Sequence, residues 1–572
     1  MQLPRRPWVL AQAAGLGVIV AALWHDLLAA LQQTVTWPAD FASYYVPARA
    51  VLTAPRTNIY DYALLLRLND LHHWVSAPVS YTGSAFYPYI YPPFALIILR
   101  PLAGLDFGPA NSIWIALMHA FALGAALLLA DAFVRAVRQR AMSKAPSSLA
   151  QRADLLLTAT ALPIGRWRFP VLPFAATSVV LLFAWPAADT YYFGQINFAV
   201  VFFVALALDA HLARRPVLAG FAIAIAGALK LTPLFLLAYF AVRRSWKALI
   251  AGAAFTALLA ALPLLFFPSH DYRMFFTELQ TLDPSLTGAA HNESLVGVFI
   301  HVTALFGGGV ATSVPTITSS TTTAGGVVPG EDLGEVVAVL LALVTLAGVF
   351  LAGLPRPLNV MSVVGRLRRT AGKKDNGVSA GSRRKSGERP SDAAHDTDTS
   401  PDPLELDWLG FALVLVIYML ATPLVWSHYY VVALPAALLL AGFPFVRRGG
   451  AEAGTTARDG WNRGDALAVY FALAALALLM EQLPYAVDRG DPGVTGLLRL
   501  LLVSSRAAGM LLIWGALGAL LLRRLRPPAG SMRNASATGA EGRGEAADKA
   551  ADKPADKPAD KPASAAIGET AD

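Results

Sequence analysis

One acidic residue, Asp40, lies at the predicted boundary between the first membrane helix and the aqueous phase. Asp40 follows the first apolar stretch of the chain, inside the run Trp-Pro-Ala-Asp-Phe-Ala-Ser-Tyr-Tyr that ends at Tyr45. A carboxylate at such a boundary acts as a general base when partial burial raises its pKa and a hydroxyl group reaches it. A solvated loop aspartate or a helix N-cap is the alternative interpretation. Asp40 has no close acidic partner in the sequence, which weakens the case for a dedicated metal site.

One basic residue interrupts an apolar stretch. Lys230 lies between residues 216 and 241, which are otherwise almost entirely apolar. An ionisable residue in such a position indicates function by default, and an ammonium group there is suited to pair with an anionic lipid phosphate. The alternative is that the side chain extends to the aqueous interface and has only a packing role.

Further polar and aromatic residues occupy short turns between apolar stretches. Gln195 and Asn197 belong to Tyr-Tyr-Phe-Gly-Gln-Ile-Asn, Asn292 precedes Glu-Ser, and His428 belongs to Trp-Ser-His-Tyr-Tyr. The amides either orient a ligand or cap the following helix. The histidine either binds substrate or bonds to a neighbouring carbonyl. The many tyrosines in these turns suit a membrane interface and suit stacking on sugar rings equally well.

The composition is that of a membrane protein. The 572 residues are 56% hydrophobic and 15% charged, the mean hydropathy is +0.51, and cysteine is absent. Soluble domains have about 25% charged residues. The lack of cysteine excludes disulfides, cysteine–zinc sites, iron–sulfur clusters and thiol nucleophiles. The net charge of +8 follows from membrane topology, so nucleic acid is not a predicted partner. No HExxH or Walker motif is present.

The chemistry-bearing residues are positioned by apolar stretches of bilayer length, about 17–26 residues each. Ten such stretches begin near Trp8, Ala110, Val171, Ile196, Trp246, Leu333, Trp408, Tyr429, Ala466 and Leu497. The predicted fold is an all-α integral membrane protein with about ten transmembrane helices and a long first outer loop.

Two apolar segments do not fit a simple crossing. Residues 216–241 have basic residues at both ends, which predicts a re-entrant hairpin of two half-length helices meeting at Lys230. Residues 92–105 are too short to cross and are predicted to form a helix lying in the outer interface.

The basic residues predict the orientation. When the crossings alternate, most of the 46 Lys and Arg residues fall on the side that holds both termini. The positive-inside rule makes that side cytosolic. We therefore expect a multi-pass protein of the cell membrane with both termini in the cytosol. The motifs around Asp40, Gln195, Asn292 and His428 then lie on the extracytoplasmic side.

The chain is predicted to have three parts. Residues 1–448 form a transmembrane catalytic module, interrupted by a disordered cytosolic insert at 371–403 that is rich in Ser, Gly, Lys, Arg and Asp. Residues 449–526 add C-terminal transmembrane helices. Residues 527–572 form a low-complexity tail that repeats Ala-Asp-Lys-Pro.

These motifs, in this order, resemble the polytopic glycosyltransferases of the GT-C type. The closest resemblance is to the family 87 mannosyltransferase-like proteins, formerly a domain of unknown function. It covers residues 8–448 apart from the insert. The motifs that carry it are Asp40 with Tyr44-Tyr45, Tyr60-Asp61, Tyr91-Pro92-Pro93, Gly194-Gln195-Ile196-Asn197, Gly220…Lys230…Pro233…Arg243-Arg244…Trp246, and Trp426-Ser427-His428-Tyr429.

The resemblance implies a reaction. Such enzymes transfer a hexose, typically mannose, from a polyprenyl-phosphate carrier to a lipid-linked or cell-envelope acceptor on the extracytoplasmic side, with inversion of the anomeric centre. Asp40 matches the acidic residue of the first outer loop in GT-C enzymes, which implies that it is the catalytic base. The donor, the acceptor and membrane lipids are then the expected partners, and no cofactor is expected.

The other site residues take their roles from the same resemblance. Charge on the leaving phosphate needs cationic or hydrogen-bonding partners, and the candidates are Lys230, His428 and Arg49. Gln195, Asn197 and Asn292 would orient sugar hydroxyls. Tyr44 or Tyr91 would stack on the sugar or hydrogen-bond to it.

Two other classes of function compete with this hypothesis. A transporter or flippase of lipid-linked sugars would show inverted repeats and polar residues paired at the bilayer midplane. The sequence shows no such internal symmetry. A non-catalytic scaffold is favoured only by the predicted disordered segments.

Overall fold

The computed structural model describes residues 39–75, 86–143, 146–280, 292–307, 331–353, 402–422, 425, 427–447, 463–479 and 496–525. The helix predicted over residues 8–31, the tail at 527–572 and residues 371–401 of the predicted insert lie outside the described residues. The chain divides into two units, Met1–Leu522 and Arg523–Asp572. Every helix and strand below belongs to the first unit, apart from the last turn of the final helix.

The predicted first outer loop is largely helical. It contains α2 (Ala39–Thr53), α3 (Tyr62–His72), α4 (Pro93–Leu99) and the 3-10 turn η1 (Leu102–Gly104). Asp61 caps α3 by accepting a 2.9 Å hydrogen bond from the N–H of Leu64. Pro93 occupies the first turn of α4, where its missing N–H is not needed. The stretch at 92–105 is therefore helical, and its place in the outer interface stays a prediction.

Long apolar helices make this a mostly helical, polytopic membrane protein. In the described part of the chain, six helices are long and apolar enough to cross a bilayer, or seven if the bent pair α7 (Val171–Phe183) and α8 (Trp185–Phe193) is one span. The predicted count of about ten crossings is thus not confirmed. The six are α5 (Phe107–Ala141), α12 (Trp246–Ala261) with η3 (Leu262–Leu265), α16 (Glu331–Gly353), α18 (Pro403–Leu420), η4 (Ser427–Val432) with α19 (Leu434–Val446), and α22 (Gly496–Leu525).

Shorter elements connect or accompany these spans. One two-stranded antiparallel hairpin departs from the predicted all-helical composition. The shorter elements are α6 (Ser148–Thr160), β1 (Leu162–Ile164), β2 (Trp167–Phe169), α9 (Asn197–Leu212), α10 (Pro216–Leu229), η2 (Thr232–Phe235), α11 (Leu236–Val242), α13 (His270–Gln280), α15 (Leu295–Gly307) and α20 (Arg463–Leu479).

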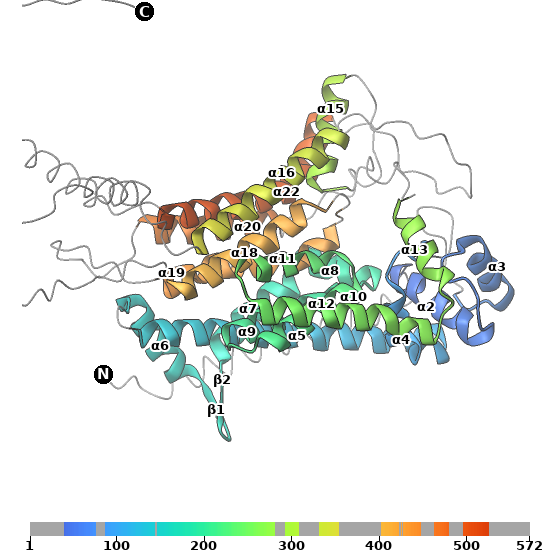
Figure 1. Ribbon diagram of the computed structural model, residues 1–572, viewed down its shortest axis with the longest axis horizontal. Helices are drawn as coiled ribbons and strands as arrows, with labels where there is room; N and C mark the ends of the chain where they lie inside the picture. The colour runs from blue at the N-terminus through green and yellow to red at the C-terminus, as the bar shows by residue number, and fades with distance from the viewer. Residues whose placement is uncertain are drawn as a thin grey trace, which may run out of the picture. The chain divides into compact units, whose positions relative to one another are not determined.

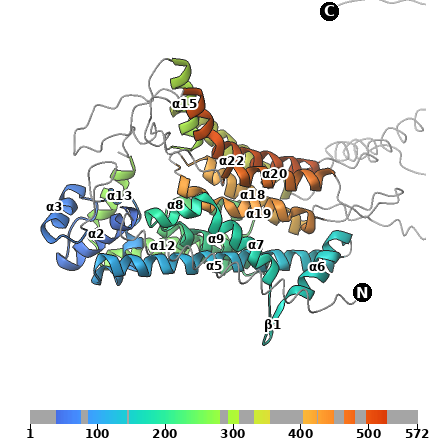
Figure 2. The ribbon, with the colours of Figure 1, turned by 180° about the vertical axis from the view of Figure 1, so that it is seen from behind.

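The helices pack in two contacting groups. In one group, α9 contacts α5 and α10, and α10 in turn contacts α12. Figures 1 and 2 show α5 and α12 running along the same direction. In the other, α18 contacts α16 and α19, and α19 contacts α20. The groups meet where α9 and α11 contact α18. All residues of α18 from Leu404 to Leu420 are buried, whereas α12 and α16 expose large side chains such as Leu258 and Leu343, both 58% exposed. Such apolar faces suit contact with lipid.

The predicted pair of half-length helices is present as α10 and α11. The hydrogen-bond ladder of α10 ends where the N–H of Lys230 bonds to the carbonyl of Ala226. Lys230 itself is extended, with φ −151° and ψ 118°. Pro233 then opens η2, because proline needs no amide partner in a first turn. The break falls at the predicted residues, and the course of this pair relative to the membrane stays a prediction.

We expect Gly220→Ala to lower the free energy of unfolding by about 1–3 kcal/mol, as overpacking does. Gly220 lies at the closest approach of α10 to α12, where an added Cβ would collide with the backbone of Ala248 and Gly252. Thermal unfolding in detergent measures the change. Gly348→Ala is the matched control, because that helical glycine has open space around it. Equal stability of the two variants would contradict the close contact.

Candidate active site

A glutamine amide joins the first outer segment to the membrane helices. Gln195 Nε2 donates a 2.5 Å hydrogen bond to Asp40 Oδ2. Its Oε1 accepts hydrogen bonds from the hydroxyls of Tyr44 at 3.1 Å and Tyr91 at 3.0 Å. Asp40 and Tyr44 are four residues apart on α2, so they lie on the same helix face. The amide therefore fixes one carboxylate oxygen and two phenols at once.

The backbone around Gln195 is held from three sides. Gly194 ends α8 in the left-handed region, with φ +69°, which a residue without a Cβ adopts readily. The N–H of Gln195 then donates to the carbonyl of Thr190 at 2.8 Å. Trp114 of α5 donates from Nε1 to the carbonyl of Gly194 at 2.7 Å. This short turn delivers the amide to Asp40 in a defined orientation.

Other tyrosines hold the segment that carries Tyr91. Tyr60 donates its hydroxyl hydrogen to the carbonyl of Tyr91 at 2.7 Å, and Tyr89 donates to the carbonyl of Pro92 at 2.8 Å. The rings of Tyr44 and Tyr91 pack edge to face with centroids 4.7 Å apart. The aromatic residues of the first outer segment thus form a packed framework around Gln195.

A lysine lies on the other side of the same turn. Lys230 Nζ donates to Asn197 Oδ1 at 3.1 Å and lies 3.1 Å from the centroid of the Tyr429 ring. Its side chain is buried, with 8% of the residue exposed. The break between α10 and η2 places this ammonium group at a helix end instead of in a regular turn. Asn197 begins α9, so residues 195 and 197 connect Asp40 to Lys230.

Burial makes Asp40 a weak acid. Removal of the carboxyl from water raises its pKa from 3.8 to about 7, against the opposing effects of the Gln195 hydrogen bond and the charge of Lys230. The residue is only partly buried, and Oδ1 has no hydrogen-bond partner among the described residues. Burial also raises the pKa values of Tyr44 and Tyr91 well above 10, so both phenols stay protonated as donors. A carboxylate with a pKa near neutrality can accept a proton from a bound hydroxyl.

Six of the nine residues proposed from the sequence come together. The structure places in this cluster Asp40, Tyr44, Tyr91, Gln195, Asn197 and Lys230. The role of each in a reaction stays a prediction.

The other three lie elsewhere or are not described. Arg49 donates from Nη1 to the carbonyls of Ala103, at 2.6 Å, and Leu105, at 3.4 Å, which ties α2 to η1. Asn292 is fully buried and accepts from the N–H groups of Ser294 and Val425. His428 belongs to η4, and its side chain lies outside the described part of the structure.

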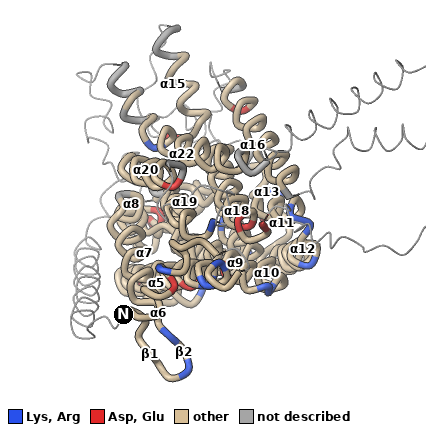
Figure 3. Tube along the Cα trace, turned by 90° about the vertical axis from the view of Figure 1, so that its left-hand side faces the viewer, with Lys and Arg blue, Asp and Glu red and all other residues tan. Residues whose placement is uncertain are grey.

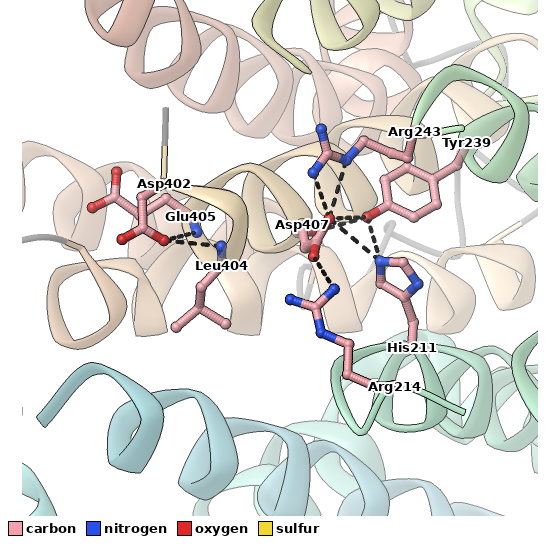
Figure 4. A network of polar contacts seen from close by, with 8 residues as sticks. All are labelled: His211, Arg214, Tyr239, Arg243, Asp402, Leu404, Glu405 and Asp407. Carbon is pink, nitrogen blue, oxygen red and sulfur yellow. Dashed lines mark hydrogen bonds and ion pairs between the residues drawn. The ribbon is translucent and has the colours of Figure 1, made fainter. Parts of the chain in front are cut away.

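Two features of the arrangement were not foreseen. Tyr429 belongs to the Trp-Ser-His-Tyr motif without a predicted role, and its ring faces Lys230. At the opposite ends of α9, α10 and α11, the buried Asp407 binds Arg243 Nη2 at 2.8 Å, His211 Nε2 at 3.4 Å and Arg214 Nη1 at 3.7 Å (Figure 4). The only sequence signal was an acidic residue immediately before a predicted span. Asp407 therefore binds arginines at both ends of the α10–α11 segment, and Lys230 lies at the break in the middle of that segment.

The fold and the cluster define a polytopic membrane protein with a partly buried aspartate near a buried lysine. The sequence model of glycosyltransferase family 87 matches residues 89–367. This match assigns residues 89–367 to that family and identifies the protein as a glycosyltransferase. The matched range contains Tyr91, Gln195, Asn197 and Lys230, whereas Asp40 precedes it. Neither the search of curated proteins nor the search of solved structures returned a match.

We expect Asp40→Asn to change how stability depends on pH. With a folded-state pKa raised from 3.8 to about 7, the folded protein binds more protons than the unfolded chain. Its stability therefore falls as pH rises from about 4 to 7. The neutral amide removes this loss, so the variant should gain in Tm over the wild type more at pH 7.5 than at pH 5. Asp70→Asn, at an exposed position on α3, is the control. An equal Tm difference at both pH values would contradict the raised pKa.

Proposed function

We propose that the protein transfers a hexose, typically mannose, from a polyprenyl-phosphate carrier to a lipid-linked or cell-envelope acceptor. The reaction takes place on the extracytoplasmic side and inverts the anomeric centre. The family supplies the reaction class, and the carbohydrate donor follows from the GT-C resemblance. The observation that carries the proposal is Asp40, with a pKa near 7, beside Lys230 on the two sides of the Gly194–Asn197 turn.

Each group has a task in a single displacement. The acceptor hydroxyl oxygen forms a bond to the anomeric carbon while the bond from that carbon to the phosphate oxygen breaks. The hydroxyl proton passes to Asp40. The leaving polyprenyl phosphate gains one negative charge, which Lys230 is placed to stabilise. Inversion follows because the acceptor attacks opposite the leaving group.

The hydrogen bonds of Gln195 support the assignment of the base. Its amide occupies Oδ2 of Asp40, which leaves Oδ1 as the oxygen able to accept a proton. Its own carbonyl is occupied by the two tyrosine hydroxyls. Because the amide is used on both sides, it cannot rotate without losing hydrogen bonds. The carboxylate is thereby preorganised for a hydroxyl that approaches from the open side.

The membrane environment suits such a donor. The isoprenoid tail can stay among the lipids while only the phosphate and sugar reach the site.

The positions of the charged residues support an extracytoplasmic active site. Arg135, Arg214 and Arg243 lie at the helix ends remote from Asp40, where they pair with Asp209 or Asp407. The positive-inside rule makes that end cytosolic, so the end with Asp40 faces outward.

We expect Asp40→Asn to lower turnover by about 10²–10⁴-fold, the range for loss of a general base. Purified protein is incubated with radiolabelled polyprenyl-phosphate-mannose and a panel of envelope lipids, and the products are analysed by mass spectrometry. Asp70→Asn is the matched control and should retain full turnover. Undiminished turnover of Asp40→Asn rejects the base. Movement of the donor across vesicles without a glycosidic product supports a flippase instead.

A second pair of variants separates two of the three candidate phosphate partners, Lys230 and Arg49. Lys230→Gln should lower kcat by about 10²–10³-fold, as removal of a group that stabilises developing charge does. Arg49→Gln should lower Tm while the folded fraction retains its kcat, because Arg49 is bonded to the backbone of Ala103 and Leu105. The reverse pattern would assign the phosphate to Arg49.

A further inference from the structure

A cavity lies remote from the Asp40 cluster, where the β1–β2 hairpin meets α5 and α6. It has a volume of about 340 Å³ and is lined in part by Asp131, Arg138, Arg166, Trp167 and Arg168. This size falls within the range of small-ligand sites. Along α5, about 31 Å of helix separates Arg135 from Trp114, at 1.5 Å per residue, and Trp114 marks the level of the candidate active site.

The hairpin has one apolar face. The register pairs Leu162 with Phe169 and Ile164 with Trp167, and directly opposed residues point to the same side of a sheet. These four side chains therefore share a face, and Arg168 lies on the other. The turn between the strands begins at Gly165, with φ +59°, as a two-residue hairpin turn requires.

That apolar face is largely uncovered. Leu162, Ile164 and Trp167 are 47%, 51% and 44% exposed, whereas Phe169 packs against Phe174 with ring centroids 5.0 Å apart. A lone two-stranded hairpin is at best marginally stable in water. Contact of this face with an apolar environment would stabilise the hairpin.

The cavity carries an excess of positive charge. Arg138 pairs with Asp154 at 3.5 Å, and Asp131 pairs with Arg135 at 2.5 Å. Arg166 and Arg168 have no ion-pair partner among the described residues. Figure 3 shows the basic colour at the turn and second strand of the hairpin. Two guanidinium groups without partners favour an anion, and phosphate suits their geometry.

The position of the hairpin along α5 indicates that it lies at the membrane surface. The apolar sequence of α5 runs to Ala130 and is followed by Asp131, Arg135 and Arg138, as expected where a span leaves the hydrocarbon. Asp131 and Arg138 line the cavity together with Trp167 and Arg168 of the hairpin, so the hairpin lies at this level of α5. In Figures 1 and 2 the hairpin extends sideways from α5, across the direction of that helix. A segment that leaves a transmembrane helix sideways at this level runs along the membrane surface.

We propose that this cavity binds the phosphate headgroup of an anionic phospholipid in the leaflet opposite to Asp40. Arg166 and Arg168 contact the phosphate, and Leu162, Ile164 and Trp167 lie among the acyl chains. Aromatic and aliphatic side chains next to arginines are the usual composition of such interfacial anchors. The proposal is independent of the transferase reaction, because it rests on residues at the other end of α5.

The absence of cysteine permits a direct test of the lipid contact. Ile164→Cys provides a single thiol for an environment-sensitive fluorophore in protein reconstituted into phosphatidylcholine–phosphatidylglycerol vesicles. Quenchers attached to the lipid acyl chains should quench this label strongly. Leu71→Cys, which replaces a side chain 71% exposed on α3, is the control and should be quenched weakly. Equal quenching at the two positions overturns the proposed contact.

The headgroup is tested with lipid titrations of detergent-purified protein, read by native mass spectrometry. The wild type should bind phosphatidylglycerol in preference to phosphatidylcholine. Arg166→Gln combined with Arg168→Gln should weaken phosphatidylglycerol binding by about tenfold or more, given the contribution of each arginine near an anionic surface. Arg67→Gln combined with Arg273→Gln removes the same charge elsewhere and should leave binding unchanged. Absence of lipid selectivity, equal weakening in the control, or full competition by inorganic phosphate overturns the proposal.

Discussion

The candidate active site depends on one amide. Gln195 is the point where the helical first outer segment, which carries Asp40, Tyr44 and Tyr91, meets the turn between α8 and α9. The side-chain partners of this amide are two phenols and one carboxyl group. Burial keeps the phenols of Tyr44 and Tyr91 protonated and raises the pKa of Asp40 to about 7. Since an unpaired polar group in this environment is costly, the amide and its partners stabilise one arrangement. The hydrogen bond from Gln195 offsets part of the cost of removing the Asp40 carboxylate from water.

The proposed reaction also requires a basic group near the leaving phosphate, and Lys230 is buried where a charge is unfavourable. Lys230 reaches the site because the chain turns back at both ends of α10 and α11, and Asp407 binds arginines from both reversals. Arg214, in one reversal, adopts a positive φ of 59°. The ion cluster at one end of the helices thereby fixes the tip at the other. Binding of Lys230 by Asn197 and the Tyr429 ring completes its position without a direct ion pair to Asp40.

Much of this was predictable from the sequence, for physical reasons. The convergence of Asp40, Gln195 and Lys230 follows from the alternation of apolar stretches and from the break at Lys230, both of which are encoded locally. Arg49 and Asn292 are different, because spacing does not reveal that their side chains bond to backbone groups. The hairpin at 162–169 was hidden within a basic loop. Its alternation of apolar and other residues is too short to distinguish a strand from a turn.

The most direct test of the central claim is the pH dependence of kcat/KM for sugar transfer. In the wild type the rate should rise with pH through an apparent pKa of about 7, because Asp40 must be deprotonated. In Gln195→Met this limb should move to higher pH, since the hydrogen bond that lowers the Asp40 pKa is lost. A profile without this limb, or one that the substitution leaves in place, would contradict Asp40 as the base held by Gln195.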